Sequence, residues 1–187
     1  MNLKLIINIK DIDKNGNVFE ENEFEANSLV KGFIGNLASQ MQQGVNQTVI
    51  RTTGYSNPTS NNAENFVINA AADFSGIVVG SDNTAVTIDD YALGTKIEHG
   101  TGAGQLEYSA NEMSTNFTVS GSNAYFEFRR TFTNNSGNDV TIHEIGLYVG
   151  NENYISSTQV CIDRTLSTTT VTNGNGKVIT YKFQVTV

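Results

Sequence analysis

The most restrictive feature of this sequence is the alternation of apolar and polar residues along its C-terminal half. Phe126 and Phe128 alternate with Glu127 and Arg129, and residues 177–187 (KVITYKFQVTV) follow the same pattern. A period of two places successive side chains on opposite faces of a β-strand. Further apolar stretches, separated by Gly and Asn turns, occur at residues 116–120, 140–149 and 154–162. We therefore expect antiparallel strands, each with one buried face.

One irregularity interrupts the stretch at residues 140–149. Ile142 and Ile145 are both apolar, so the alternation slips by one residue at His143-Glu144. A β-bulge inserts one extra residue into a strand and would bring Ile145 and Leu147 back to the core. We therefore expect a bulge at His143-Glu144.

The N-terminal residues predict a β-hairpin. Residues 3–10 (LKLIINIK) alternate in the manner of a half-buried strand, and residues 18–24 would return as the second strand. Between them, Asn15-Gly16 supplies the positive φ angles that tight hairpin turns require.

A helix is expected at about residues 28–43, where apolar residues recur at helical spacing. Ser28 or Asn27 offers a side-chain oxygen that can cap the first turn, and Gly44 can end the helix in a left-handed conformation. Gly32 and Gly35 weaken a helix, or else they allow another backbone to approach it closely. The segment at about residues 52–65 (TTGYSNPTSNNAEN) has turn-forming residues throughout and predicts a long exposed loop.

Composition narrows the fold class. A length of 187 residues suits one domain, which we place at residues 1–187. Cys161 is the only cysteine, so stability must come from packing or assembly rather than from an internal disulfide. The sequence has no Trp, a single Pro and many turn-forming residues. We predict a mainly β fold, an antiparallel β-sandwich of jelly-roll or immunoglobulin-like type with one N-terminal helix.

The charge balance bears on partners and location. Asp and Glu number 19 against 11 Lys and Arg, and the net charge of −8 argues against direct binding of nucleic acid, whose phosphates attract basic surfaces. No stretch has the roughly 20 consecutive apolar residues that span a bilayer, and the N-terminus lacks the pattern of a signal peptide. We expect a protein that is made in a cytoplasm and does not contact a membrane.

One short motif suggests a metal ion. Asp11, Asp13, Asn15 and Asn17 match the opening of a calcium loop, in which alternate oxygen-bearing side chains converge on the cation. The twelfth position is Asn22, however, where such loops carry a bidentate Glu. An Asn-Gly hairpin turn explains the same residues, so both interpretations stay open.

Motifs for catalysis are weak. Ser28 and Lys31 have the spacing of a penicillin-recognising enzyme, but the KTG and SDN triplets of those enzymes are missing. His99, His143 and Cys161 could in principle form a nucleophilic pair, although Cys161 lies in an apolar alternation that is typical of a buried strand. We expect a protein that is not an enzyme and that needs no cofactor other than the calcium considered above.

Three stretches resemble small virion proteins of tailed bacteriophages, including the crAss-like phages of the gut. Residues 76–104 (GIVVGSDNTAVTIDDYALGTKIEHGTGAG) begin with a buried strand and contain the pattern D-D-x-x-L-x-x-x-I-x-H-G. Residues 130–148 (RTFTNNSGNDVTIHEIGLY) are similar to a run that ends in E-I-G-L-Y. The third stretch combines residues 161–165 (CIDRT) with the closing strand at 176–187. Together they cover about a third of the chain.

The resemblance implies a non-enzymatic structural component of the virion that packs as repeated copies in a neck or tail ring or collar. Its partners would be other copies of itself and virion proteins such as portal, ring, tail or fibre proteins. Exposed loops in assembly proteins commonly become ordered against neighbours. We therefore predict interface contacts at Gly54, Tyr55, Asn57 and Pro58 in the long loop and at Lys14 in the hairpin tip.

An alternative of a different class shares the same fold. Capsid decoration, or a head-fibre or tail-fibre module that binds a carbohydrate receptor, would also suit a β-sandwich. Sugar faces stack on exposed aromatic rings, and in a chain without Trp the candidates are tyrosines such as Tyr55, Tyr91 and Tyr108.

Overall fold

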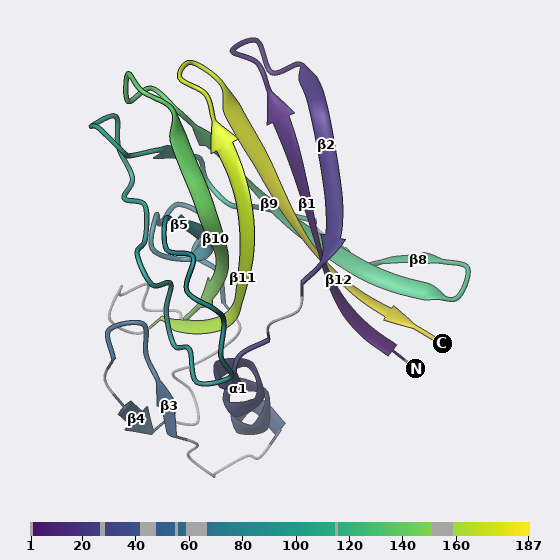
Figure 1. The fold of residues 1–187 in the computed structure, drawn as a ribbon. Coiled ribbons are helices and arrows are strands. Elements are labelled where there is room, and N and C mark those ends of the chain that lie inside the picture. Colours follow the sequence, from purple (N-terminus) through teal and green to yellow (C-terminus); the bar gives the residue numbers. More distant parts are fainter. Residues whose placement is uncertain are drawn as a thin grey trace. The chain divides into compact units, whose positions relative to one another are not determined.

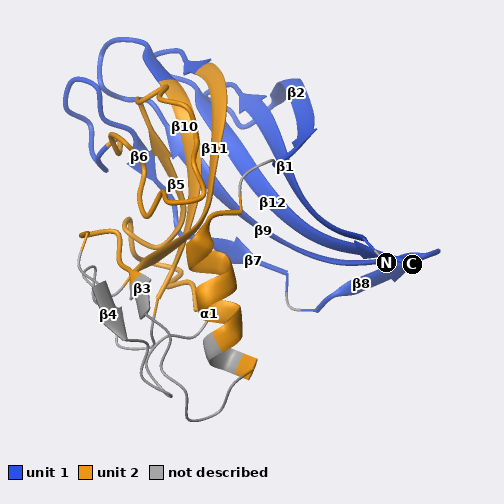
Figure 2. Cartoon of the chain, turned by 60° about the horizontal axis from the view of Figure 1, so that its bottom comes forward, with its two compact units in different colours: residues 1–27, 98–141, 170–187 blue, residues 28–97, 142–169 orange. Residues whose placement is uncertain are grey.

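The computed structural model describes residues 2–26, 29–41, 48–54, 56–58, 67–114, 116–150 and 159–187, shown as a ribbon in Figure 1. They form two compact units, which Figure 2 distinguishes by colour. The first unit consists of Met1–Asn27, Glu98–Thr141 and Thr170–Val187, and the second of Ser28–Ile97 and Ile142–Thr169. A single domain over residues 1–187 stays a prediction.

The first unit contains a seven-stranded antiparallel sheet. Its strands are β1 (Asn2–Ile12), β2 (Val18–Glu25), β6 (Glu107–Tyr108), β7 (Glu112–Met113), β8 (Thr118–Ser120), β9 (Asn123–Thr133) and β12 (Gly176–Thr186). Their order is β2-β1-β12-β9-β6, and β7 and β8 also pair with β9. The pairing of β1 with β2 confirms the predicted hairpin. Strands β1 and β12, far apart in the sequence, are neighbours throughout their length.

The alternation found in the sequence determines which face of this sheet is buried. Leu5, Ile7 and Ile9 on β1 all point to the buried face. Phe128 on β9 lies directly opposite Tyr181 on β12, and their rings stack with centroids 5.7 Å apart. Such a ring pair adds about 0.5–1.5 kcal/mol to the effect of burial itself. The predicted period of two is therefore confirmed on both strands.

The second unit contains a smaller antiparallel sheet, a short strand pair and a helix. Strands β5 (Gly76–Gly80), β10 (Val140–Val149) and β11 (Val160–Val171) form the sheet in the order β11-β10-β5, although the first two residues of β10 and the last two of β11 belong to the first unit. Strands β3 (Thr48–Ile50) and β4 (Ser56–Pro58) form the pair, and the helix is α1 (Lys31–Met41). All residues of β5 are buried, as its apolar sequence predicted.

The bulge that we expected at His143-Glu144 stays a prediction, because the described pairing of β10 with β5 begins only at Glu144. The pairing of β10 with β5 runs without a shift from Glu144 to Tyr148. Glu144 is itself fully buried, and so are Ile142 and Ile145. The apolar run of β10 therefore contains a buried carboxylate, which the alternation did not predict.

Helix α1 falls within the segment predicted as a helix at about 28–43, whose residues 28, 42 and 43 lie outside the described residues. Its apolar spacing indicated a buried face, yet Ile34 and Met41 are 61% and 77% exposed. The buried positions include Gly32 instead. A Cβ atom at Gly32 would lie 2.2 Å from the carbonyl oxygen of Cys161 on β11, so the close backbone approach considered for this glycine is confirmed.

The segment predicted as a long loop at about 52–65 contains strand β4, and its residues 55 and 59–65 lie outside the described residues. The predicted fold class is confirmed, because the described residues are mainly β, with antiparallel sheets and a single helix, which is consistent with a β-sandwich. No helix among these residues is long and apolar enough to cross a bilayer.

The substitution Gly32→Ala tests the close approach of α1 to β11. Alanine normally stabilises a helix interior by about 1 kcal/mol relative to glycine. Here we expect the opposite sign, a loss of about 1–3 kcal/mol, because the new Cβ collides with the backbone of Cys161. Urea unfolding measures the difference. Ile34→Ala on the exposed side of the helix is the control, and a Gly32→Ala variant as stable as the parent would contradict the expectation.

Candidate functional site

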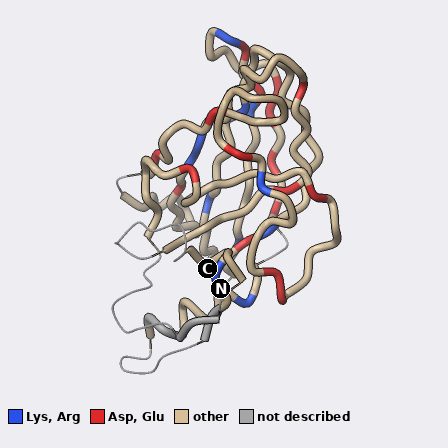
Figure 3. The backbone as a smooth tube through the Cα atoms, turned by 90° about the vertical axis from the view of Figure 1, so that its left-hand side faces the viewer, with Lys and Arg blue, Asp and Glu red and all other residues tan. Residues whose placement is uncertain are grey.

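Acidic and basic residues are spread along the chain (Figure 3), but one group in the second unit is withdrawn from solvent. At its centre is Arg164 on β11, whose side chain is 4% exposed. Its Nε donates to Glu144 at 2.7 Å, Nη1 to Asp90 at 2.7 Å and Nη2 to Asp82 at 3.1 Å. Nη2 also donates to the carbonyl oxygen of Thr84 at 3.2 Å. We call Arg164 and its three carboxylate partners the Arg164 cluster.

Glu144 connects the cluster to the backbone of residues 81–97. Its carboxylate, which is fully buried, accepts hydrogen bonds from the backbone N–H groups of Gly94 and Thr95, both at 3.0 Å. The N–H of Asp82 is a more distant donor, at 3.4 Å. A buried carboxylate needs such donors because burial without them costs several kcal/mol. Glu144 thereby fixes the irregular segment 81–97 to strand β10.

Two neighbours of Glu144 on β10 complete the attachment of this segment. The hydroxyl of Tyr148 accepts a hydrogen bond from the backbone N–H of Leu93 at 2.6 Å. Gly146, between them, leaves space for Leu93, since a Cβ atom there would lie 2.8 Å from the Leu93 side chain. Gly80 on β5 likewise leaves space for Glu144, whose Oε1 would be 2.3 Å from an added Cβ. The motif E-I-G-L-Y is thus explained by local packing.

The two aspartates of the cluster are held ionised by their surroundings. Burial opposes ionisation of Asp90, but hydrogen bonds from Thr87 and Arg164 outweigh it and hold the pKa of Asp90 below its ordinary value. For Asp82, the main cause of a lowered pKa is the hydrogen bond from the Thr84 hydroxyl, and the charge of Arg164 adds to it. Two carboxylates with lowered pKa values are poor proton acceptors at neutral pH.

This arrangement is suited to fixing a loop rather than to a reaction. A guanidinium stays charged in proteins, and here it lies between the carboxylates, where a metal cation would otherwise bind. Among the described residues, no group of three or more His, Cys, Asp or Glu side chains could hold a metal ion.

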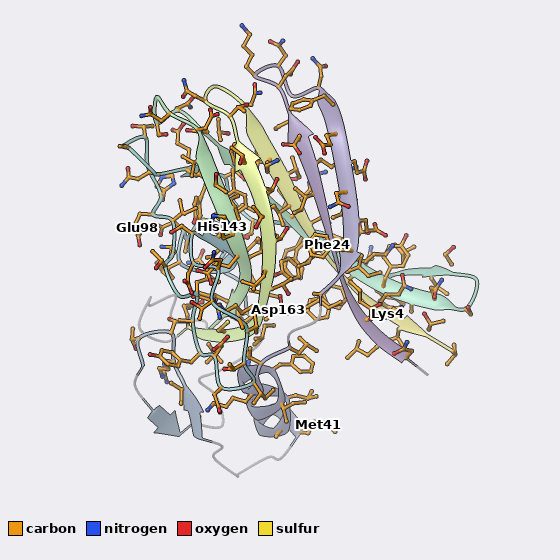
Figure 4. The ribbon with its side chains drawn as sticks, viewed as in Figure 1. Lys4, Phe24, Met41, Glu98, His143 and Asp163 are labelled. Atoms are coloured by element: carbon orange, nitrogen blue, oxygen red, sulfur yellow. The ribbon has the colours of Figure 1, made fainter. Side chains whose placement is uncertain are left out.

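The side chains considered for nucleophilic catalysis have other contacts. Cys161 is buried, which raises the pKa of its thiol well above the ordinary value, and its Sγ donates to the carbonyl oxygen of Asp163 at 3.2 Å. His143, which Figure 4 labels together with Asp163, shares a hydrogen bond with the hydroxyl of Thr168 at 3.2 Å. In the first unit, His99 accepts a backbone N–H at 2.9 Å. Within the described part of the chain, no hydrogen bond links Cys161 to a histidine.

The predicted calcium ligands adopt the geometry of a hairpin turn. Asp13 accepts hydrogen bonds from the backbone N–H groups of Asn15 and Asn17 at 2.8 and 2.9 Å, and from the Asn17 amide at 2.9 Å. The Asn17 side-chain amide is the main cause of a lowered pKa at Asp13. Asp11 is paired with Lys177. Since these oxygens already accept protein donors, calcium binding stays a prediction that would require the turn to rearrange.

The predicted interface residues lie in both units. Lys14 is exposed at the tip of the β1-β2 hairpin. Gly54 is exposed in a turn with a φ of 82°, a left-handed conformation that favours glycine. Asn57 and Pro58 belong to β4, and their side chains, like all of Tyr55, lie outside the described residues. Their contact with neighbouring subunits stays a prediction.

One face of the sheet in the first unit forms an open groove of about 660 Å³ across β1, β2, β7, β9 and β12. Its charged side chains are mostly paired with each other. Arg129 donates to Glu112 from Nε at 2.9 Å and from Nη2 at 2.7 Å, and Lys10 lies 3.3 Å from Glu21. Such a surface, with nearly balanced charge and many polar groups, suits a neutral polar ligand better than an ion.

The substitution Arg164→Met tests the importance of the cluster for folding. It removes the guanidinium and leaves three partly or fully buried carboxylates without their shared cation, so we expect a loss of about 3–5 kcal/mol in the free energy of unfolding. Arg129→Met is the matched control, because the pair with Glu112 is about 60% exposed and should contribute at most about 1 kcal/mol. Urea unfolding of both variants measures the two losses. Equal losses of unfolding free energy in the two variants would show that burial of the Arg164 cluster does not increase its contribution to stability.

The lowered pKa values of Asp82 and Asp90 predict a loss of stability in acid. Because their pKa values are lower in the folded chain, both add stability above the unfolded value of about 4, and this contribution disappears as the pH falls through the folded values. Thermal unfolding, followed by circular dichroism over a pH series, should show this decline. The decline of the unfolding temperature with falling pH should be shallower in Asp90→Asn than in the parent chain. The same slope in both would contradict the contribution assigned to Asp90.

The Arg164 cluster draws its members from the three stretches that the sequence analysis singled out. Asp82 and Asp90 lie in residues 76–104, Glu144 in residues 130–148 and Arg164 in residues 161–165. The sequence did not identify them as site residues, because isolated carboxylates and a single Arg form no local pattern. In comparisons with known proteins, no family model, no curated protein and no solved structure matched the chain.

Proposed function

We propose that this chain is a non-enzymatic structural component of a tailed-phage virion, packed as repeated copies in a neck or tail ring or collar. Its partners would be further copies of itself and virion proteins such as portal, ring, tail or fibre proteins. When identical subunits repeat around a symmetry axis, many weak contacts between them together stabilise the assembly.

The observation that carries this proposal is the convergence of the three phage-like stretches on the Arg164 cluster. If those stretches marked a catalytic centre, their polar side chains would be directed at a substrate. Instead, Glu144 and Tyr148 accept backbone N–H groups, and Arg164 joins residues from three segments of the chain. These contacts fix the backbone of the chain, and this supports a structural role.

The cluster also supports a packing surface. Segment 81–97, which it holds, exposes Ile88 and Tyr91 at 62% and 43%. The backbone carbonyl of Ile88 accepts a hydrogen bond from the N–H of Lys31 at the start of α1, and Lys31 Nζ lies 2.8 Å from Asp89. Apolar side chains on a fixed backbone lose little conformational freedom on association, which favours permanent contacts.

A second candidate function is a receptor-binding or capsid-decoration module. The polar groove of the first unit favours it, because paired charges such as Arg129 with Glu112 can hydrogen-bond sugar hydroxyls. Of the tyrosines proposed for stacking, Tyr91 is exposed, Tyr108 is 8% exposed and packs edge-on against Phe132, and Tyr55 lies outside the described residues. None of the described residues that line the groove is a tyrosine.

The proposal predicts that the chain is present in intact particles in a fixed ratio to the other virion proteins. Quantitative mass spectrometry of particles purified from a culture whose phage encodes the chain measures that ratio. Light scattering of the purified chain, with and without calcium, measures self-association. Absence from purified particles would reject a virion role, and a monomer that binds glycans in an array would favour the receptor-binding module.

A further inference from the structure

A lysine and an aspartate face each other inside the first unit. Lys177 on β12 lies directly opposite Asp11 on β1 in the pairing of the two strands. The Lys177 side chain is 2% exposed, the Asp11 side chain is 16% exposed, and Nζ of the lysine contacts Oδ1 of the aspartate. Both residues are on the face of the sheet that buries Ile9 and Ile179.

As an ion pair, this contact is poorly satisfied. An ammonium group has three N–H donors, and among the described residues Asp11 accepts the one hydrogen bond that Nζ of Lys177 makes. Taking a lysine and a carboxylate out of water costs more than their attraction returns unless further hydrogen bonds complete the pair. On the same sheet, Lys4 and Glu25 form a comparable pair at 2.8 Å, but with 36% and 50% of their side chains exposed to water.

We propose that Lys177 and Asp11 are joined by an intramolecular amide bond that forms once the sheet has folded. Proton transfer within the pair gives a neutral amine and a protonated carboxyl group. The Nζ lone pair then attacks Cγ of Asp11, a new N–C bond forms, the C–OH bond breaks, and the hydroxyl leaves with one amine proton as water. The product carries no charge and a single N–H donor, which suits a buried position better than an ammonium.

A third residue is placed to transfer the protons. Glu20 on β2 lies directly opposite Asp11, so Glu20, Asp11 and Lys177 occupy one row across three adjacent strands. Side chains opposite each other on neighbouring strands lie on the same face, with Cβ atoms about 5 Å apart. We assign to Glu20 the role of taking a proton from the attacking nitrogen and giving one to the departing hydroxyl. The partly exposed side of Asp11 gives the released water a path to solvent.

The bond would join the first and last long strands of the chain and enclose nearly all of it in one covalent loop. Cross-links that close long loops restrict the unfolded state most strongly. This inference does not depend on the proposed virion role, because the pair lies within one unit and needs no partner. Loss of either conclusion would leave the other intact.

The intact mass of the purified, fully denatured chain tests the proposal directly. We expect a mass lower than that of the printed sequence by one water molecule, and a branched peptide after proteolysis that contains both Asp11 and Lys177. A full mass with separate peptides would overturn the bond and leave an ordinary ion pair. Since the parent chain is measured, the result does not depend on whether any variant folds.

Variants identify the atoms involved. Lys177→Met should restore the full mass, whereas the control Lys4→Met, at the exposed pair, should keep the deficit of one water. Asp11→Asn should lose ammonia instead of water and reach the same linked product. Glu20→Gln should lower the linked fraction at a fixed time after refolding while the circular dichroism spectrum stays unchanged. An unaltered fraction in Glu20→Gln would overturn the role assigned to Glu20.

Discussion

Withdrawal of the Arg164 guanidinium from water is the constraint on which the second unit depends. A buried cation is tolerated only when acceptors surround it, and here they come from three places in the sequence, Asp82, Asp90 and Glu144. Because each carboxylate is fixed by its own donors, the segment that carries Asp82 and Asp90 has little freedom to move. An irregular stretch without helix or strand thereby acquires a defined position against β10.

Buried polar side chains have a comparable effect in the first unit. Asn134, which is fully buried, donates from its amide to the carbonyl oxygens of Asn138 and Val171 at 2.8 and 2.6 Å. Its backbone carbonyl accepts the N–H of Gly174, so one residue connects two turns of the chain. The apolar alternation therefore produces the strands. A few hydrogen-bonded polar side chains, such as that of Asn134, fix the turns between them.

This division explains what could be predicted from the sequence. The strands around Phe128 and Tyr181 were predictable, because burial of one face of a strand makes apolar and polar residues alternate in the sequence. The burial of Glu144 was not, because the backbone donors to its carboxylate, Gly94 and Thr95, lie about 50 residues away in the sequence. Helix α1 was predicted at the right place, but its contact side depends on Gly32, a residue that hydrophobic spacing ignores. In the sequence, the only sign of the Arg164 cluster is indirect. It consists of glycines such as Gly146, which stand where a neighbouring side chain needs space.

The cluster also shows why carboxylates close together need not indicate a reactive or metal-binding centre. Such centres depend on oxygen atoms that are still available to a ligand, whereas Asp82, Asp90 and Glu144 all accept hydrogen bonds from within the chain. The same bonds that remove their reactivity hold Ile88 and Tyr91 on a fixed backbone. Without them, a segment with few ladder hydrogen bonds, made beside its antiparallel bridge between Lys96 and Gly80, would open at little free-energy cost. The hydrogen bonds around the buried Arg164 guanidinium thus both occupy the carboxylates and fix the backbone of segment 81–97. A surface that packs repeatedly against copies of itself requires such a fixed backbone.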